Sequence, residues 1–329
     1  MTKVLITGGA GFIGYHLAKH LATDGYQVDL LDNLSRGVVD GDLKLLTNNS
    51  KVRLLTGDLS RHDAFDGLEH DYSYIYHLAS IIGVANVEQQ PYAVIRDNML
   101  MLVNLLSFAK RQIKLDRVVF ASTSEVYAGT QRFFDLPIPT PESVPLTLSE
   151  LSQPRTSYML AKICGEGLCH HSDVPWTIVR PHNVYGPRMG MAHVVPELLN
   201  RVYRSTNGSL EVYSVEHRRS FCYVTDAVVM IRAVAESNVC VCETLNIGSQ
   251  GPEITIGELA QTITKVTMKP LKVIPRPATP GSPVRRCPDM TKTISVTGYR
   301  PQVGLETGIG LTSEWYRAQV FEGNEVMAC

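Results

Sequence analysis

A glycine-rich turn near the start of the chain separates a strand-like run from a helical segment. The run 4–6 is apolar, and Gly8, Gly11 and Gly14 follow it at intervals of three. Here the first glycine permits a tight turn, the second lets the backbone approach a pyrophosphate, and the third lets the helix pack closely on the strand. The start of the helix also points N–H groups at phosphate oxygens. The chain is therefore predicted to begin with a dinucleotide-binding βα unit.

Short apolar runs alternate with helical segments through the first 180 residues. Each run is rich in branched or aromatic residues and is bounded by turn signals, which favours a parallel sheet covered by helices on both faces. We predict an α/β fold: a Rossmann-type doubly wound parallel sheet in an NAD-binding domain, 1–180. Glycine and proline interrupt the later elements, so 181–329 is expected to form mainly a smaller α/β substrate lobe, with 244–247 returning to the main sheet. The runs are 4–6, 28–31, 52–55, 74–76, 118–120 and 177–179.

Composition narrows the class of protein. The net charge of -1 offers no basic field for nucleic acid. The longest apolar runs are far shorter than the roughly 20 residues that span a bilayer. The number of cysteines, seven, is odd, so a disulfide framework is not predicted. Cys240 and Cys242 lack a second pair of ligands that could complete a metal site, so no metal site is predicted. We expect a cytoplasmic protein without nucleic-acid or membrane partners.

Asp32 ends the second strand-like run and bears on the choice of cofactor. A carboxylate at this position accepts hydrogen bonds from the adenine ribose hydroxyls and repels a 2′-phosphate, which favours NAD over NADP. Arg36 is the opposing feature, because a nearby arginine can accept that phosphate. Asp32 followed by Asn33 is also a common turn sequence. The position of Asp32 relative to the glycines nevertheless predicts NAD.

Tyr158 and Lys162 stand about one helical turn apart. A tyrosine has an unperturbed pKa near 10, which is too high for a base at neutral pH. A lysine one turn away, together with the positive charge of a nicotinamide, would stabilise the phenolate. Thr123 follows the apolar run 118–120 upstream. These residues predict a centre for hydride transfer at a sugar carbinol.

Taken together, these segments resemble the extended short-chain dehydrogenase/reductase family, in its branch of NAD-dependent epimerases and dehydratases of nucleotide sugars. The resemblance covers nearly the whole chain. Besides the segments above, it rests on Gly57-Asp58-Leu59, His77-Leu78-Ala79-Ser80, Asn98, Arg180 to Pro187, Arg219 to Asp226, Arg285 to Asp289 and Glu314-Trp315-Tyr316.

This resemblance implies further roles. Asp58 would lie near adenine, and Asn183, Arg219 and Arg285 would bind the diphosphate of a UDP-sugar, since arginines pair with phosphate oxygens in charge-assisted hydrogen bonds. It also implies a homodimer that pairs through helices at about 91–111 and 154–172. The remaining cofactor contacts that it implies are Phe12, Ile13, Asn33, Leu59, Leu78 and Ala79.

Glu125 separates this chain from a simple alcohol dehydrogenase. Family members first oxidise the sugar at C4; a dehydratase or decarboxylase then acts at C5 and C6, whereas a 4-epimerase needs no second base. Many 4,6-dehydratases carry Thr-Asp-Glu where this chain has Thr123, Ser124 and Glu125. The base is present and the acid is replaced by serine, a pattern that also resembles UDP-glucuronate decarboxylases. The segment leaves loss of water and loss of carbon dioxide both open, and Glu125 could instead cap a helix.

The loop 80–86 contains no cation to receive a C6 carboxylate, although Arg96 and Arg188 remain possible partners. The neutral loop better suits a C6 hydroxyl. The pattern is most similar to the UDP-N-acetylglucosamine 5,6-dehydratases of tunicamycin biosynthesis. That likeness implies oxidation at C4, loss of water across C5 and C6, and return of hydride to C4. The alternatives are a UDP-glucuronate decarboxylase, a 4,6-dehydratase, a UDP-hexose 4-epimerase, and a regulatory protein that senses NAD without turnover.

Overall fold

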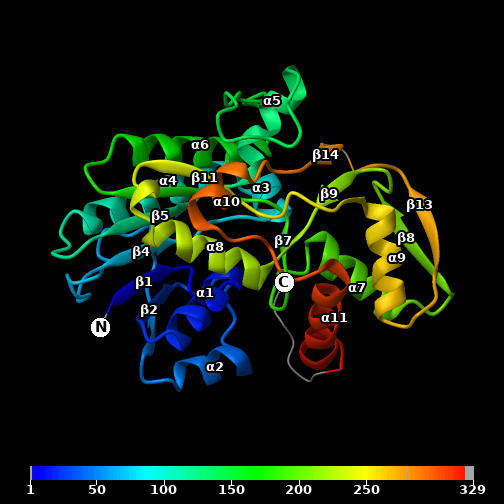
Figure 1. Cartoon of the computed structure of the whole chain (residues 1–329), viewed down its shortest axis with the longest axis horizontal. Helices are drawn as coiled ribbons and strands as arrows, with labels where there is room; N and C mark the ends of the chain where they lie inside the picture. Colours follow the sequence, from blue (N-terminus) through cyan, green and yellow to red (C-terminus); the bar gives the residue numbers. More distant parts are fainter. Residues whose placement is uncertain (1, 280, 323–329) are drawn as a thin grey trace.

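A seven-stranded, all-parallel sheet forms the centre of the protein (Figure 1). The computed structural model describes residues 2–279 and 281–322. The strand order β11-β6-β5-β4-β1-β2-β3 confirms the predicted doubly wound fold, and the last strand joins the sheet from the C-terminal half of the chain. The strands are β1 (Lys3–Thr7), β2 (Gln27–Asp32), β3 (Val52–Thr56), β4 (Tyr74–His77), β5 (Arg117–Ala121), β6 (Trp176–Pro181) and β11 (Glu243–Ile247).

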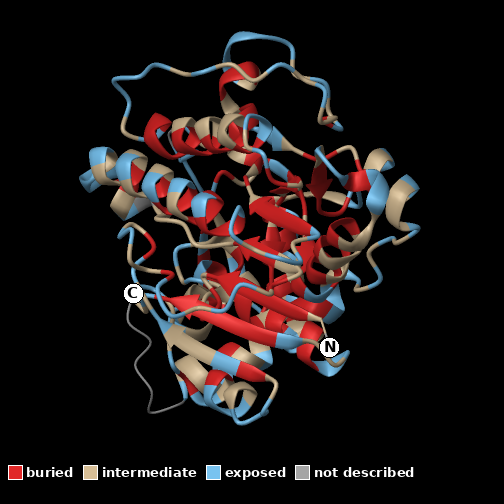
Figure 2. Cartoon of the chain, turned by 90° about the vertical axis from the view of Figure 1, so that its left-hand side faces the viewer, coloured by how far each residue is buried: buried red, intermediate tan, exposed pale blue. Residues whose placement is uncertain are grey.

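Helices cover both faces of this sheet. Alternate residues of a strand point to opposite faces, so in β1 Val4 and Ile6 pack in one apolar cluster and Leu5 in another. The first cluster includes α1 and α8, and the second includes α4, with α6 packed beside it. Figure 2 shows the buried residues concentrated in the sheet and on the inner faces of these helices. The helices are α1 (Phe12–Thr23), α2 (Gly41–Thr47), α3 (Val84–Gln89), α4 (Pro91–Ala109), α6 (Thr156–His170) and α8 (Val224–Glu236).

Most of the remaining elements build a smaller lobe beyond one end of the sheet, whereas α5 lies in a protruding segment and α10 (Thr291–Thr297) packs against α8 and β11 of the main sheet (Figure 1). Besides the seven-stranded sheet, the chain forms three small sheets with the strand orders β10-β7, β12-β9-β14 and β13-β8. The strands are β7 (Val184–Tyr185), β8 (Ser209–Tyr213), β9 (Arg218–Ser220), β10 (Cys222–Tyr223), β12 (Glu253–Thr255), β13 (Lys272–Arg276) and β14 (Arg285–Arg286). The helices are α5 (Ala128–Phe133), α7 (Val194–Arg204), α9 (Ile256–Val266), α10 (Thr291–Thr297) and α11 (Leu305–Tyr316), with the short turns η1 (Ser124–Tyr127), η2 (Asn238–Cys240) and η3 (Arg317–Phe321).

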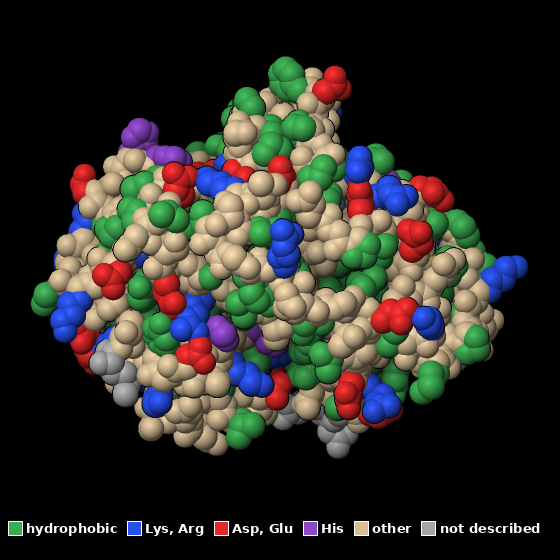
Figure 3. Space-filling view, viewed as in Figure 1, with side chains coloured by type: hydrophobic (Ala, Val, Ile, Leu, Met, Phe, Trp, Pro, Cys, Tyr) green, Lys and Arg blue, Asp and Glu red, His purple; other side chains and the backbone are tan. Residues whose placement is uncertain are grey.

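The surface carries both signs of charge. Figure 3 shows basic and acidic side chains interspersed over the face that it presents, in keeping with a net charge of -1. Within residues 2–279 and 281–322, no helix combines the length and apolar character needed to cross a bilayer.

Candidate active site

The predicted site residues gather at the carboxyl ends of β1, β4 and β5. The chain builds the sheet outward from β1 to β3 and then crosses back to β4, so the strand order reverses between β1 and β4. Ligands of open α/β sheets bind in the crevice beyond the strand ends at such a point. The glycine turn follows β1, Leu78 and Ala79 follow β4, and Ser122 to Glu125 follow β5.

The glycine turn forms a cradle lined by backbone. Gly8 adopts a left-handed φ of 71°, and a Cβ added to it would lie 2.7 Å from the Ala79 nitrogen. A Cβ on Gly14 would lie 2.3 Å from the Gly8 carbonyl oxygen. Side chains are therefore excluded at both positions, and α1 begins directly against the turn with Gly11 as its N-cap. The arrangement fits a dinucleotide pyrophosphate held by backbone N–H groups.

Asp32 is held beside this cradle. Its carboxylate accepts hydrogen bonds from the backbone N–H of Ala10 at 3.0 Å and of Leu34 at 2.8 Å. Burial raises the pKa of Asp32, while these two N–H groups oppose the rise. Arg36 lies elsewhere: its guanidinium is close to Gly190, and its charge acts on Tyr158. This placement removes the sequence argument for a 2′-phosphate partner.

The other predicted cofactor contacts lie at neighbouring strand ends, and their contacts with NAD remain predictions. Leu78 donates its N–H to the Thr7 carbonyl at 3.1 Å, which joins the ends of β4 and β1. The Asp58 carboxylate accepts from the Ser60 N–H and hydroxyl, so in this structure it stabilises the turn after β3. The further predicted residues sit at the start of α1 (Phe12, Ile13), after β2 (Asn33) and after β3 (Leu59).

Tyr158 and Lys162 lie on α6 and face the end of β5. The Thr123 and Ser80 side chains lie next to the Tyr158 hydroxyl and act to lower its pKa. Burial raises the pKa of Tyr158, and the charge of Glu125 adds to the rise. Lys162 donates to the Ala121 carbonyl at 2.7 Å, and burial lowers the pKa of its ammonium to about 8. The structure thus brings the predicted catalytic pair together with Thr123.

Glu125 is the second residue of η1 and pairs with Arg286, for which no role was predicted from sequence. Its N–H is capped by the Thr123 hydroxyl at 3.2 Å, so Thr123 and not Glu125 caps this turn. The Glu125 carboxylate accepts from the Arg286 guanidinium at 2.7 Å. The charge of Arg286 lowers the pKa of Glu125, with smaller contributions from Arg155 and Arg219. Glu125 is therefore an ionised carboxylate at neutral pH.

Neighbouring arginines of β14 point in different directions. Arg285 binds both carboxylate oxygens of Glu253 at 2.7 Å and is half-exposed. Arg286 pairs in register with Arg219 of β9, and the two guanidinium charges interact with each other and with Glu125. Because side chains alternate along a strand, Arg286 faces Glu125 where Arg285 does not. That alternation distinguishes Arg286 from Arg285 only once β14 is placed beside β9 and Glu125 in the fold.

The three predicted ligands of the diphosphate are therefore arranged unequally. Arg219 is buried, and burial lowers the pKa of its guanidinium to about 10. Asn183 has a left-handed φ of 43° and donates to the Ser220 carbonyl at 2.9 Å. Arg219 and Asn183 thus meet near β9, whereas Arg285 is engaged with Glu253. Contact of all three with a diphosphate remains a prediction.

The two cations considered for a C6 carboxylate are engaged elsewhere. Arg96 pairs with the adjacent Asp97 and lies over the exposed Tyr92 ring. Arg188 is buried against Asp40 and stacks over the Tyr15 ring, with 4.3 Å between its guanidinium carbon and the ring centroid. Neither pairing involves Glu125 or Tyr158.

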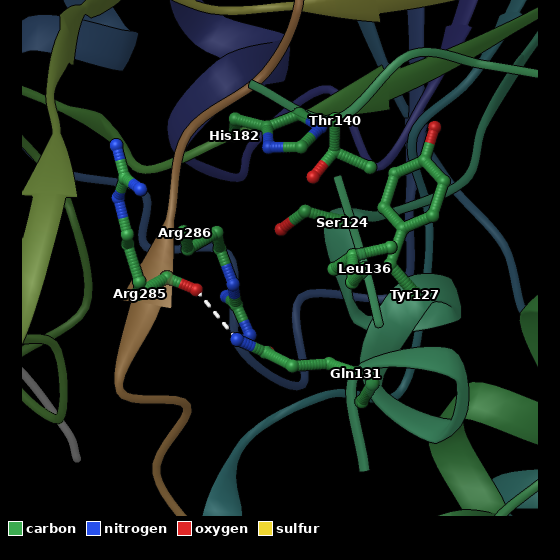
Figure 4. Close-up of a pocket in the computed structure, with 9 residues that line it drawn as sticks. Ser124, Tyr127, Gln131, Leu136, Thr140, His182, Arg285 and Arg286 are labelled. Atoms are coloured by element: carbon green, nitrogen blue, oxygen red, sulfur yellow. Dashed lines mark hydrogen bonds between the residues drawn. The ribbon is translucent and has the colours of Figure 1, made fainter. Parts of the chain in front are cut away.

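A small cavity of about 10 Å³ lies behind Ser124 (Figure 4). His182 and Thr140 face it from one side and Arg286 from another, while Leu136 and Gln131 approach from the α5 segment. His182 is buried with 1% of its surface exposed. No role for His182 could be predicted from the sequence, because no local pattern shows that its ring lies beside Ser124.

Comparison with known proteins identifies relatives along the whole chain. A model of the NAD-dependent epimerase/dehydratase family matches residues 4–248. UDP-N-acetyl-alpha-D-glucosaminuronate decarboxylase of Bacillus cytotoxicus is 32% identical over an alignment of 329 positions. The alignment covers 96% of this chain and 98% of that protein. TunA, an NAD-dependent NDP-hexosamine 5,6-dehydratase involved in tunicamycin biosynthesis, has a TM-score of 0.80 and 28% identity, covering 98% of this chain and 100% of its own. The UDP-glucuronic acid 4-epimerase of Bacillus cereus, solved with UDP-glucuronic acid and NAD, has a TM-score of 0.80 and 25% identity. This match covers 96% of the present chain and 99% of the epimerase.

Replacement of Tyr158 tests the hydride-transfer centre. Tyr158→Phe removes the hydroxyl that is predicted to take part in proton transfer from the carbinol, so reduction of NAD⁺ by added UDP-sugars should fall on the order of 10²–10⁴-fold while NAD binding persists. The readouts are NADH absorbance in single-turnover mixtures and NAD affinity by calorimetry. Tyr213→Phe, at an exposed position of β8, is the matched control and should behave as the unaltered protein. Full activity of Tyr158→Phe would remove Tyr158 from the mechanism.

Proposed function

We propose that this chain, which belongs to the NAD-dependent epimerase/dehydratase family, is a UDP-N-acetylglucosamine 5,6-dehydratase. The family is one of enzymes acting on nucleotide sugars, and its cofactor is NAD, as the glycine turn and Asp32 predicted. The finer activity rests mainly on one observation: an ionised Glu125 lies beside Tyr158, so two bases serve one site. A 4-epimerase needs only the first of them.

The residues divide the chemistry between two carbons. NAD, which the glycine turn and Asp32 would hold, would supply the acceptor for the C4 hydride and the donor for its return. Tyr158 receives the proton of the C4 hydroxyl, helped by the Lys162 ammonium one turn away. The resulting C4 ketone acidifies the C5 proton, which Glu125 removes as the C6 hydroxyl departs. Tyr158 then returns its proton to the C4 oxygen, and the product is a 5,6-ene with its 4-hydroxyl restored.

The surroundings of Glu125 favour loss of water. The loop 80–86 contains no cation, and both Arg96 and Arg188 are engaged in other ion pairs. Arg286 is already paired with Glu125. A substrate with a C6 hydroxyl adds no second carboxylate next to Glu125. The likeness to TunA supports the same reading.

A decarboxylase acting on a UDP-linked uronic acid is the second candidate. Two findings favour it: the 32% identity to a UDP-N-acetyl-alpha-D-glucosaminuronate decarboxylase, and the charges of Arg286, Arg155 and Arg219 around Glu125. Those charges could receive a C6 carboxylate if Arg286 exchanged Glu125 for the substrate.

We further propose that the enzyme works as a cytoplasmic homodimer. The helices α4 and α6 pack side by side, close to the bounds predicted for a pairing surface. Helix α4 leaves Tyr92, Leu100 and Val103 exposed, and burial of this apolar surface would favour association.

The product formed from UDP-N-acetylglucosamine tests the proposal. Loss of one water with two exocyclic alkene protons and no methyl doublet, by mass and proton NMR, is the expected result. A methyl doublet would establish a 4,6-dehydratase, and carbon dioxide released from a UDP-uronic acid instead would establish the decarboxylase. Tight NAD binding without hydride transfer to or from any sugar nucleotide would favour a sensing protein.

Substitution of Glu125 separates the two half-reactions. Glu125→Gln should still form NADH transiently, because Tyr158 and Lys162 are intact, but should form no alkene, since the C5 base is lost. The measurement pairs stopped-flow NADH absorbance with NMR of the quenched mixture. Glu150→Gln, which alters an exposed partner of Arg132, is the control. Normal turnover by Glu125→Gln would show that another group removes the C5 proton.

A further inference from the structure

The cavity behind Ser124 has the dimensions of a site for one water molecule. Its volume of about 10 Å³ is close to the minimum that a water requires. Ser124 and His182 line it on the side of the buried network, and Gln131 and Arg285 line it nearer the surface. There Gln131 donates to the Arg285 carbonyl at 2.8 Å, drawn as the dashed line in Figure 4.

A chain of buried hydrogen bonds has a fixed direction as it approaches this cavity. Arg180 can only donate, and its Nη1 lies 2.7 Å from the Tyr127 hydroxyl oxygen. Tyr127 therefore donates onward to the Asn246 Oδ1 at 3.1 Å. The Asn246 Nδ2 donates to the carbonyls of Thr140 and Asp289, which fixes the orientation of the amide. Asn246 thus presents its oxygen, an acceptor, to the next group.

That next group is His182. Its Nε2 lies 3.0 Å from the Asn246 Oδ1, so Nε2 carries the proton and Nδ1 has a bare lone pair. Nδ1 is buried and has no hydrogen-bond partner within the described part of the chain. Burial, with the charge of Arg286, lowers the pKa of His182 to about 3, so the ring is neutral. A buried acceptor without a partner destabilises the fold, and a water in the cavity would supply the missing hydrogen bond.

We propose that His182 and Ser124 hold one water molecule in this cavity and that this water turns the Ser124 hydroxyl toward the C6 oxygen of the substrate. The water donates one hydrogen to His182 Nδ1 and the other to Ser124 Oγ. With its lone pair so engaged, Ser124 directs its own hydrogen away from the cavity and into the active site. Arg286 can donate to the water oxygen from the cavity wall. His182 is then a positioning residue that acts through Ser124.

This inference rests on the proposed function and supplies the proton that the leaving oxygen needs. As Glu125 takes the C5 proton, the C5–H electron pair becomes the C5–C6 double bond, and the C6–O pair leaves with oxygen. Ser124 protonates that oxygen, which departs as water, and recovers a proton from the cavity water. The cavity water draws one from solvent past Gln131, and Glu125 releases its own to solvent after the product leaves. A serine backed by an ordered water thereby replaces the carboxylic acid of the Thr-Asp-Glu pattern.

The water and the imidazole tautomer can be tested without any reaction. A high-resolution crystal structure of the NAD-bound protein should show one water within about 2.7–3.2 Å of both His182 Nδ1 and Ser124 Oγ. Long-range proton–nitrogen NMR correlations should show a neutral His182 protonated at Nε2, identified by comparison with His182→Asn. Absence of the water, or protonation at Nδ1, would overturn the proposal. Either result stands whether or not the wild-type product is a 5,6-ene, so failure of this inference and failure of the proposed function are distinguishable.

Paired substitutions test the route through Ser124. His182→Phe and Ser124→Ala should each slow alkene formation about tenfold or more, with transient NADH formation retained. The double variant should be no slower than Ser124→Ala, because both changes interrupt one route. His182→Asn, whose amide oxygen can occupy the place of Nδ1, should recover part of the rate. Multiplicative losses in the double variant, or a parallel loss of NADH formation in His182→Phe, would show that His182 does not act through Ser124.

Discussion

The buried ion pair between Glu166 and Arg180 is the interaction on which both halves of the site depend. Arg180 of β6 donates to the two oxygens of Glu166 at 2.9 and 2.6 Å, and both side chains are buried. Glu166 also accepts from Ser122 at the end of β5, and Arg180 donates to Tyr127 at the end of η1. Removal of one partner of such a pair costs about 3–5 kcal/mol, because it leaves a buried charge uncompensated.

This pair fixes the relative positions of Tyr158 and Glu125, the two groups proposed as bases. Tyr158, Lys162 and Glu166 follow one another at intervals of four residues, so they share a face of α6. Anchoring Glu166 to β6 therefore turns Tyr158 and Lys162 toward the end of β5. On the other side, Tyr127 holds the end of the short turn that contains Glu125. The spacing between the two proposed bases thus follows from the packing of one helix on one sheet.

The sheet, the glycine turn and the Tyr158–Lys162 pair could be predicted because each is encoded in a local pattern. The alternation of apolar runs with helical segments, the spacing of the glycines and the interval of four residues between Tyr158 and Lys162 can each be recognised without knowledge of the rest of the chain. The partner of Glu125 could not be predicted, since Arg285 and Arg286 differ only in which side of β14 they occupy. The ion pair of Arg188 with Asp40 and the hydrogen bond of His182 with Asn246 each connect residues more than 60 positions apart in the sequence. Such contacts depend on tertiary structure and have no local signature.

In the proposed reaction, hydride leaves C4 and returns to C4 while water is lost across C5 and C6. UDP-N-acetylglucosamine labelled with deuterium at C4 is the substrate that follows this hydride. We expect a 5,6-ene that keeps the deuterium at C4 in every turnover, with none in solvent. Deuterium at C6, in a product with a methyl group, would exclude the proposed reaction, because hydride would then have been delivered to the carbon that lost the hydroxyl.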